Sequence, residues 1–555
     1  MTFADEKMMH PEDIEVEQFS EAGKSEAPAE PKYDTVMDKL AYHKKGVVVL
    51  LSALILIICL SVDLDEQRPL ASRGLAVLLI VALWWLTEVL PLTVSSLFPI
   101  VLYPLLAVAS PSALAGKFFG GTSFLFVGGF IIGLAIERWG LHIRIICAVV
   151  CNTGKRPDVL LAGFMGAVFL LSMWISNTAT AVCMMPVVHT FLKQLPDDAH
   201  KFKQAVLLSV GWSASIGGIA TPVGTPTNGI FLDQYLVLWP NAGEFPFATF
   251  VFAALPLALI LLFILWFSIS AYFVWFSKTK IVINTETFHQ MRRDLGPMTY
   301  EEIIVSLDLV VLVALWFTAS PIGSFPGWKV HVAENLNSGS IGLLVTLPLF
   351  IVPCGAQLPK VLKNLLGDNR CLSKVEEKKR PMHILDWDAV KGGFSWEILF
   401  VFGGGAMLAY GTVASGLAGW IAEQLSQVGG GEFGFVLIVS CVVCMVTEVV
   451  SNTSTMSIFG AIIAATASLK GFNGVQMMMG VCFTASFCFM LPTATPPNMV
   501  VYATGLIKVR EMAKMGALLD LIAIFVGTCY FVFIMPAILG DDFEAENIGE
   551  PAISA

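Results

Sequence analysis

The chain has 555 residues, of which 56% are hydrophobic and 14% are charged, and its mean hydropathy is +0.75. Soluble domains carry about 25% charged residues, so this composition excludes an ordinary soluble protein and indicates a helical membrane protein. The net charge of −10 comes largely from acidic residues near the two ends and does not indicate a nucleic-acid partner. The eleven cysteines lie mostly in apolar segments, which argues against a disulfide framework.

The apolar runs, taken in chain order, predict an all-α polytopic membrane protein with about 11 transmembrane helices and two re-entrant helical hairpins. Residues 1–45 form an acidic tail that we expect to be disordered, because it has few apolar side chains to bury. The first half of the membrane region spans 46–277 and the second half spans 303–538, with a polar loop at 278–302 between them. An acidic tail at 539–555 ends the chain.

Basic residues predict the orientation, since Lys and Arg are retained on the cytoplasmic side of a membrane. Clusters occur at 43–45, 152–157, 374–381 and 507–514, and no Lys or Arg follows Lys514. We therefore expect a cytoplasmic N-terminus, an extracytoplasmic C-terminus and an odd number of crossings. The plasma membrane is the expected location.

Three landmarks occur twice, in the same order and about 270 to 276 positions apart, which indicates an internal duplication. The first is a Gly-rich apolar segment, the second is the tripeptide Ser-Asn-Thr with a hydroxyl residue four positions before it, and the third is a Thr-Pro-x-Asn element. The pairs are 125–141 with 401–417, 176–178 with 451–453, and 223–228 with 493–498.

Each Ser-Asn-Thr follows an apolar run too short to cross a bilayer, which predicts hairpin tips at 172–180 and 447–455. The Pro and Gly residues of the third landmark predict broken helices at 217–228 and 491–498. Duplicated halves of this kind are typical of inverted-repeat transporters, whose binding site lies near the middle of the membrane where broken helices meet.

Such breaks can bind both an anion and a cation. Free N–H groups at helix N-termini suit the oxygens of an anion, while backbone carbonyls and side-chain oxygens suit Na⁺. No Lys or Arg lies within about twenty residues before either Ser-Asn-Thr. The charge of a dianion would therefore need compensation by co-bound cations.

At these landmarks the sequence resembles the divalent anion/sodium symporter family, whose members carry dicarboxylates, citrate or sulfate. The matching motifs are both Ser-Asn-Thr signatures, both Thr-Pro loops, "WWLTEVLPL" at 84–92 and "GGG" at 403–405, and the similarity extends over about 45–540. The resemblance implies an elevator-type transporter of inverted-repeat architecture that forms a homodimer in the lipid bilayer.

The resemblance also implies the site residues, with two or more Na⁺ ions transported together with one small dianion. The Na⁺ ligands would be Ser172, Ser176, Asn177 and Gly224 in the first half and Thr447, Ser451, Asn452 and Ala494 in the second half, with Gly224 and Ala494 acting through backbone carbonyls. Substrate carboxylates would contact Asn177, Thr178, Thr225, Asn452, Thr453, Thr495 and Pro496. No organic cofactor is expected.

The function predicted from these residues is sodium-coupled symport of small divalent anions, with succinate, malate and fumarate as the favoured substrates. The alternatives are a Na⁺-independent dicarboxylate or citrate exchanger, a sulfate transporter and, in a different class, an anion channel. An enzyme is not expected, because no nucleophile–base pair or phosphate loop is visible. Glu448 next to the second tip is interpreted as a structural hydrogen-bonding residue, with a proton site as the alternative, because Met173 stands at the matching place in the first half.

One departure from the repeat follows the second tip, where Gly460 replaces the Pro186 of the first half. This glycine could loosen the helix that it occupies.

Overall fold

The structure is a computed structural model that describes residues 36–196, 198–276, 286–321, 326–332, 335–355, 381–427, 431–540, 543 and 551–552. The predicted disordered tail up to residue 35, the basic cluster up to residue 380 and most of the acidic C-terminal tail lie outside the described residues. The chain divides into two units, Met1–Leu51 and Ser52–Ala555. In the first unit the described residues are helical from Val36, ten positions before the first apolar segment predicted from the sequence.

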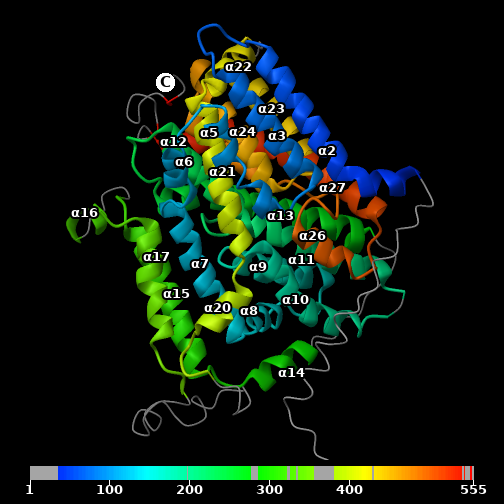
Figure 1. Cartoon of the computed structure of the whole chain (residues 1–555). Coiled ribbons are helices and arrows are strands. Elements are labelled where there is room, and N and C mark those ends of the chain that lie inside the picture. The colour runs from blue at the N-terminus through cyan, green and yellow to red at the C-terminus, as the bar shows by residue number, and fades with distance from the viewer. Residues whose placement is uncertain are drawn as a thin grey trace, which may run out of the picture. The chain divides into compact units, whose positions relative to one another are not determined.

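The regular elements before residue 286 are all helices within the described ranges (Figure 1). Their bounds are α2 Val36–Ser61, α3 Ala71–Thr87, α4 Leu92–Ser95, α5 Pro99–Leu105, α6 Pro111–Phe118, α7 Gly121–Arg138, α8 Leu141–Val150, α9 Pro157–Ser172, α10 Asn177–Leu192, α11 His200–Ile219, α12 Pro226–Leu238 and α13 Phe247–Ile269, which continues as the π-helical turn η1 Ser270–Trp275.

The regular elements from residue 286 onward are also helical in the described part of the chain. Their bounds are α14 Glu286–Leu295, α15 Tyr300–Thr318, α16 Lys329–Val332, α17 Ser338–Thr346, the 3-10 turn η2 Leu347–Phe350, α20 Trp387–Gly393, α21 Trp396–Ala414, α22 Leu417–Ser426, α23 Glu432–Thr447, α24 Asn452–Leu469, α25 Gly474–Thr484, α26 Pro496–Tyr502, α27 Val509–Phe533 and α28 Met535–Leu539. Of the segment predicted as a polar loop, 278–302, the described part from residue 286 contains α14 and the first residues of α15, and Phe288 of α14 is buried.

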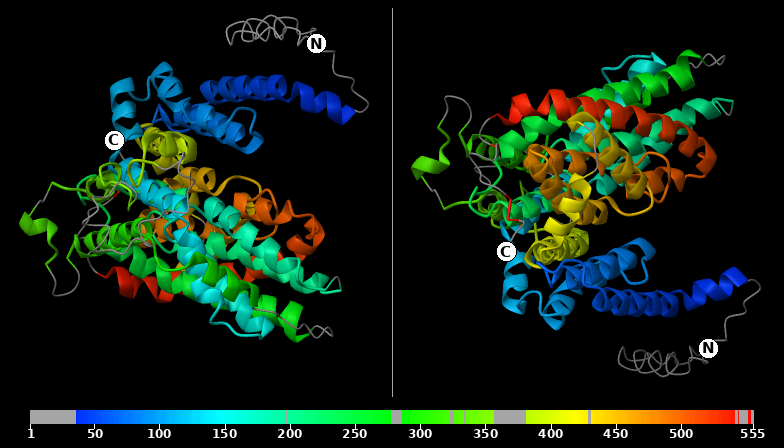
Figure 2. Two further views of the ribbon diagram at one scale, coloured as in Figure 1. Left: turned by 90° about the horizontal axis from the view of Figure 1, so that it is seen from below. Right: turned by 90° about the horizontal axis from the view of Figure 1, so that it is seen from above.

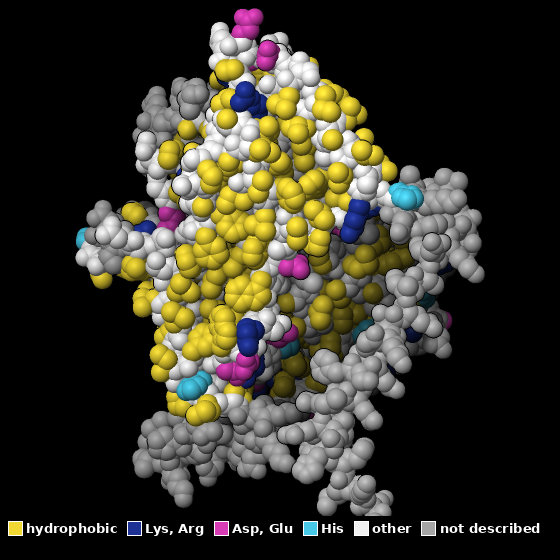
Figure 3. Space-filling model, viewed as in Figure 1, with side chains coloured by type: hydrophobic (Ala, Val, Ile, Leu, Met, Phe, Trp, Pro, Cys, Tyr) yellow, Lys and Arg dark blue, Asp and Glu magenta, His cyan; other side chains and the backbone are white. Residues whose placement is uncertain are grey.

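Five stretches of helix among the described residues are long and apolar enough to cross a membrane. They are His43–Ser61, Pro111–Arg138, Phe247–Trp275, Trp396–Ala414 and Val509–Phe533. Figure 3 shows a face on which hydrophobic side chains predominate, with few charged side chains between them. This pattern fits contact with lipid acyl chains, and the predicted count of about 11 crossings stays a prediction.

Two helical hairpins have polar tips, at the positions that the Ser-Asn-Thr motifs indicated. In the first, four residues separate α9 from α10, and the Ser176 hydroxyl caps α10 by accepting a hydrogen bond from the Ala179 N–H at 3.2 Å. In the second, Ser451 caps α24 in the same way, through the Ser454 N–H at 3.2 Å. The motif therefore ends one helix and starts the next, because its serine satisfies a free N–H of the new helix.

Two irregular segments interrupt helices in the third landmark. The first, between α11 and α12, covers 220–225 and lies within the predicted break at 217–228. The second, between α25 and α26, covers 485–495, so the predicted start at 491 was wrong. Within this segment the Glu448 carboxylate accepts hydrogen bonds from the N–H groups of Met490 and Leu491, both at 2.9 Å, so these two groups are satisfied without a helix.

The hairpins and the broken helices pack across the two halves of the chain. α12 lies against α24 of the second hairpin, and α26 lies against α10 of the first hairpin and against α11 (Figure 1). Gly460 of α24 makes room for Gln234 of α12, whose amide donates to the Ser457 carbonyl at 3.0 Å. α24 continues as a helix through Gly460, and the expected loosening stays a prediction.

A long C-terminal helix joins the halves at a second place. α27 lies against α13 (Figure 2). At this contact the Tyr530 hydroxyl donates to the Ala253 carbonyl at 2.8 Å.

Candidate functional site

One cavity of about 730 Å³ brings together both hairpin tips and both helix breaks. Ten of the thirteen residues predicted for the site line it, namely Ser176, Asn177, Thr178, Thr225, Ser451, Asn452, Thr453, Ala494, Thr495 and Pro496. The other three, Ser172, Gly224 and Thr447, lie behind this lining. Segments that are about 270 residues apart in the sequence therefore meet at one place.

Four polar atoms cluster behind the first tip. The inward atom of the Asn177 amide lies 2.7 Å from Ser172 Oγ, 3.1 Å from the Ala214 carbonyl oxygen and 3.3 Å from the Gly224 carbonyl oxygen. Ser172 Oγ itself donates to the Ala214 carbonyl at 2.7 Å. With nitrogen pointing inward, the amide has all three oxygens within reach and can donate its two hydrogens to two of them. With oxygen pointing inward, it completes an all-oxygen set of the kind that suits a small hard cation.

The second tip repeats this cluster. Thr447 Oγ1 lies 2.9 Å from Asn452 Oδ1 and 2.7 Å from the Ala485 carbonyl oxygen, and its one hydrogen can be donated to either acceptor. The Asn452 amide nitrogen contacts Cys488 Sγ at 3.6 Å, which leaves Oδ1 of the same amide facing Thr447. In this half, the oxygen of the amide already points toward the hydroxyl.

The two clusters differ at the residue that faces the asparagine. A Cβ on Gly218 would lie 2.2 Å from Asn177 Oδ1, so the first cluster requires glycine there. The matching residue of the second half, 270 positions later, is Cys488. A Cβ on Gly224 would lie 2.5 Å from the Gly218 carbonyl oxygen, whereas the second half has Ala494 at the matching place. The backbone is therefore folded more tightly at the first break.

The asparagine that ends each third landmark holds its break in shape. The Asn228 amide donates to the carbonyls of Gly218 at 3.0 Å and Thr221 at 2.7 Å. The Asn498 amide donates to Cys488 at 2.8 Å and to Leu491 at 3.0 Å. These side chains satisfy carbonyls that the broken helices leave free.

Glu448 and Thr221 tie each tip to the break behind it. The Glu448 carboxylate reaches the second break as described above, and its structural role stays a prediction. In the first half, Thr221 of the break donates its hydroxyl to the carbonyl of Met173 at 2.5 Å. In both halves a side chain links the tip to the break. In the second half this side chain belongs to the tip, and in the first half it belongs to the break.

The cavity offers hydrogen-bond donors and little charge. α10, α12 and α24 all begin at it, with free N–H groups and the positive ends of their dipoles. Among the described residues that line it, none is basic, and Glu397 is the only charged one. The cavity can therefore bind anionic oxygens through neutral groups, but it does not supply a positive side chain to balance them.

Sequence reasoning missed part of this lining. Leu92 and the segment between α20 and the start of α21 also face the cavity, through Phe394, Ser395, Trp396, Glu397, Ile398 and Val401. Leu92 ends the "WWLTEVLPL" motif, which could have indicated it. Phe394 to Val401 lie just before the "GGG" motif and carry no signal of their own in the sequence.

The fold and the cavity define a class of protein, an all-helical membrane transporter. Comparison with known proteins gives the family. Residues 41–535 match the family described as "Sodium:sulfate symporter transmembrane region", and the chain belongs to this family. It is accordingly a transporter and not an enzyme.

Curated relatives match most of the chain. A protein of Staphylococcus saprophyticus named sodium-dependent dicarboxylate transporter SdcS is 30% identical over 500 residues, which cover 88% of this chain and 91% of that protein. The protein of the same name from Staphylococcus aureus is 32% identical over 479 residues, with coverage of 84% and 86%. Among solved structures, the YdaH transporter of Alcanivorax borkumensis aligns with 76% of this chain and 87% of its own, at a TM-score of 0.50 and 12% identity, a likeness of fold alone.

Proposed function

We propose that this protein is a secondary-active, sodium-coupled symporter of small divalent anions, and that its substrates are C4-dicarboxylates such as succinate, malate and fumarate. Membership in the symporter family supports sodium coupling. The relatives named as sodium-dependent dicarboxylate transporters support a dicarboxylate over sulfate or citrate.

The observation that carries the proposal is that Asn177 and Asn452, one from each hairpin tip, line a single cavity without a basic side chain among its described lining residues. A dianion held there by amides and hydroxyls keeps its full charge. Two or more co-bound Na⁺ ions balance that charge, so substrate and Na⁺ bind together. The cycle is neutral with two ions and electrogenic with three.

The Na⁺ ions are the co-transported cargo, and the oxygen clusters behind the tips are their proposed sites. In the first, Ser172 Oγ, the Gly224 carbonyl and the Asn177 amide oxygen, turned inward, bind the ion, with Ser176 from the tip. In the second, Thr447 Oγ1, Asn452 Oδ1, Ser451 and the Ala494 carbonyl take these roles. Turning the Asn177 amide places its nitrogen toward the cavity, where it donates to a carboxylate. Na⁺ binding thereby prepares the first tip for the anion.

The substrate carboxylates lie between the two tips. One carboxylate accepts hydrogen bonds from Asn177, Thr178 and Thr225. The other accepts hydrogen bonds from Asn452, Thr453 and Thr495, and it lies next to Pro496. The N-termini of α10, α12 and α24 add free N–H groups and partial positive charge.

The wider architecture is part of the same proposal. The two halves, 46–277 and 303–538, form inverted repeats. The recurrence of their landmarks in order and the matching contacts of their breaks support the duplication, and such duplicated halves are typically inverted in transporters. The loaded hairpins and broken helices move as one body across the bilayer in an elevator motion, against a scaffold through which two copies dimerise. The N-terminus is cytoplasmic, the C-terminus is extracytoplasmic, and the plasma membrane is the location.

The test is uptake of radiolabelled succinate into proteoliposomes that contain the purified protein. We expect saturable uptake that requires an inward Na⁺ gradient and is inhibited by excess malate or fumarate. Counterflow of succinate that is as fast without Na⁺ as with Na⁺ would indicate an exchanger. Non-saturable flux would indicate a channel. Uptake of sulfate but not succinate would contradict the proposed substrate.

A further inference from the structure

The two oxygen clusters behind the hairpin tips differ in the number of hydrogens that they contain. In the first cluster, the Ser172 hydroxyl lies 2.7 Å from the Ala214 carbonyl oxygen and can donate its hydrogen there. The inward nitrogen of Asn177 lies 2.7 Å from Ser172 Oγ and 3.3 Å from the Gly224 carbonyl oxygen, and it has two hydrogens to donate. Three hydrogens thus serve three oxygens, so this cluster can satisfy its own oxygens without a cation.

The second cluster contains fewer hydrogens. Thr447 Oγ1 lies 2.9 Å from Asn452 Oδ1 and 2.7 Å from the Ala485 carbonyl oxygen, and its one hydrogen serves a single acceptor at a time. The described residues offer no further hydrogen-bond donor to either oxygen. One of the two oxygens is therefore left without a hydrogen, next to the fully buried Thr447 and Ala485, and this is unfavourable. A cation among these oxygens would supply the missing positive partner.

Cys488 holds the Asn452 amide in this orientation. The amide nitrogen of Asn452 lies 3.6 Å from Cys488 Sγ, and the thiol hydrogen is directed to the Ser486 carbonyl at 3.5 Å. The fully buried sulfur therefore accepts from the amide, which directs the amide oxygen into the cluster. In the first half Gly218 stands at the matching place, and glycine has no side chain to receive the nitrogen of Asn177.

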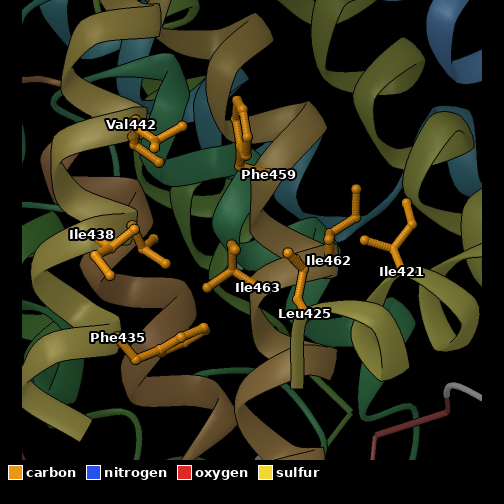
Figure 4. A pocket seen from close by; sticks show the side chains of 10 residues that line it. Ile421, Leu425, Phe435, Ile438, Val442, Phe459, Ile462 and Ile463 are labelled. Atoms are coloured by element: carbon orange, nitrogen blue, oxygen red, sulfur yellow. The ribbon is translucent and has the colours of Figure 1, made fainter. Parts of the chain in front are cut away.

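A second cavity beside the second hairpin has a different chemistry. It has a volume of about 290 Å³ and lies between α22, α23 and α24, where Phe435 and Val442 of α23 stand opposite Phe459 of α24 (Figure 4). The described residues that line it are all aliphatic or aromatic, so their side chains have no oxygen for a hard cation such as Na⁺. Of these two places on the hairpin, only the tip cluster suits Na⁺.

We propose that the two Na⁺ sites fill in a fixed order: the site of the second half binds Na⁺ without the dianion, and the site of the first half binds Na⁺ only together with it. This inference rests on the proposed function. Na⁺ at the first site requires the Asn177 oxygen to point inward, so the amide gives up its two hydrogen bonds in the cluster. The turned nitrogen then donates to the substrate carboxylate, which replaces part of that loss. Because one rotation serves both ligands, each favours the binding of the other by the same factor.

Equilibrium binding of radioactive Na⁺ to the purified full-length protein, measured by scintillation proximity with choline keeping the ionic strength constant, tests the order. We expect one ion per protomer without succinate and at least one more at saturating succinate. Thr447→Ala should abolish the binding that is seen without succinate. Ser172→Ala, the equivalent change in the first half, should leave that binding within about twofold of the unmodified protein and weaken only the succinate-dependent ion.

Cys488→Ala tests the positioning role of Cys488, because it removes the sulfur and keeps the Cβ. We expect the affinity for Na⁺ without succinate to fall about threefold, the effect of one weak hydrogen bond, and Cys488→Ser to restore it through a hydroxyl that also accepts from the amide. Cys444→Ala is the matched control, since this buried thiol of the same hairpin donates to the Phe487 carbonyl at 3.2 Å. Succinate is left out because Thr495, a proposed substrate residue, also contacts the Cys488 thiol.

The possible failures of this proposal and of the proposed function are distinguishable. Two ions bound without succinate, or none, would overturn the order and leave sodium-coupled symport in place. Loss of the succinate-free ion in Ser172→Ala but not in Thr447→Ala would overturn it too. If Thr447→Ala does not yield monodisperse protein, Cys488→Ala replaces it, and an affinity equal to that of Cys444→Ala would contradict the role of Cys488. Succinate uptake that does not require Na⁺ would contradict the proposed function itself.

Discussion

The hydroxyl of Ser172 lies 2.7 Å from the side-chain amide of Asn177, and 275 positions later the hydroxyl of Thr447 stands 2.9 Å from that of Asn452. Each hydroxyl also has a backbone carbonyl as an acceptor. Ser172 reaches the carbonyl of Ala214 in α11, and Thr447 reaches that of Ala485 at the end of α25. The last turn of one hairpin arm is thereby linked to the first residue of the other arm. If these pairs bind Na⁺, the same two contacts fix the position of each tip.

Ser172→Ala should weaken Na⁺ binding without loss of the folded protein. The variant removes one proposed ligand and leaves the Ala214 carbonyl without its hydroxyl donor, a loss of about 1–3 kcal/mol. We expect the Na⁺ concentration for half-maximal succinate uptake to rise about tenfold. Thr190→Ala is the matched control, because this hydroxyl of the same hairpin is exposed and serves only the Pro186 carbonyl in the described structure. An unchanged Na⁺ dependence in Ser172→Ala would exclude this residue as a ligand.

Thr495→Ala should act on the anion more than on Na⁺. The Thr495 side chain lines the cavity and stands at the start of α26, outside the Thr447–Asn452 cluster. Losing one hydrogen bond to a carboxylate should raise the KM for succinate about tenfold at saturating Na⁺. The Na⁺ activation curve at saturating succinate should stay within about twofold of the original. Equal changes in the two constants would argue against a substrate contact for this residue.

The Ser-Asn-Thr motifs indicated the positions of both tips from the sequence alone. A polar break in an apolar run is typical of a new helix start when a serine stands where it can cap the residues that follow. The length of the second break was not predictable. Met490 and Leu491 read as apolar helix residues, and only the fold brings Glu448 to their N–H groups.

Tertiary packing also explains the residues of the site that the sequence did not indicate. Phe394 and Trp396 reach the cavity because α21 packs against α12 and α24. The role of Gly218 depends on the distance between two helices, which no local pattern records.

Gly218→Ala should therefore abolish uptake while leaving the hairpin folded. The new Cβ would lie 2.2 Å from Asn177 Oδ1, so the Asn177 side chain has to leave the cluster. We expect succinate uptake to fall at least about a hundredfold, as for a displacement of about 1 Å in a binding geometry. Gly166→Ala is the control, since a Cβ on this glycine of α9 meets nothing within 4 Å. Uptake in Gly218→Ala at the level of Gly166→Ala would show that Asn177 can move without consequence.

Asp386 provides a prediction for the dependence of stability on pH. It precedes α20, and its carboxylate accepts a hydrogen bond from Arg138 at the end of α7 at 2.6 Å. This bond from Arg138 is the main cause that holds the pKa of the Asp386 carboxyl below its usual value of 3.8, and the Ala389 N–H adds to it. Since the pKa is lower in the folded state, the carboxylate stabilises the fold above the usual pKa. The stabilisation is lost as the pH falls through the lower, folded value.

Asp386→Asn separates this charge effect from helix capping, because asparagine still accepts the Ala389 N–H as a helix cap. At pH 6 we expect the purified variant to have a lower Tm than the unmodified protein, and near pH 3 we expect the two values to approach each other. Asp388→Asn serves as the control, since Asp388 pairs with Lys391 on the surface with 88% of its side chain exposed, where an ion pair contributes little. The difference in Tm between Asp386→Asn and the unmodified protein could instead stay constant from pH 6 to pH 3. That result would mean that the Arg138 contact does not act through the charge of Asp386.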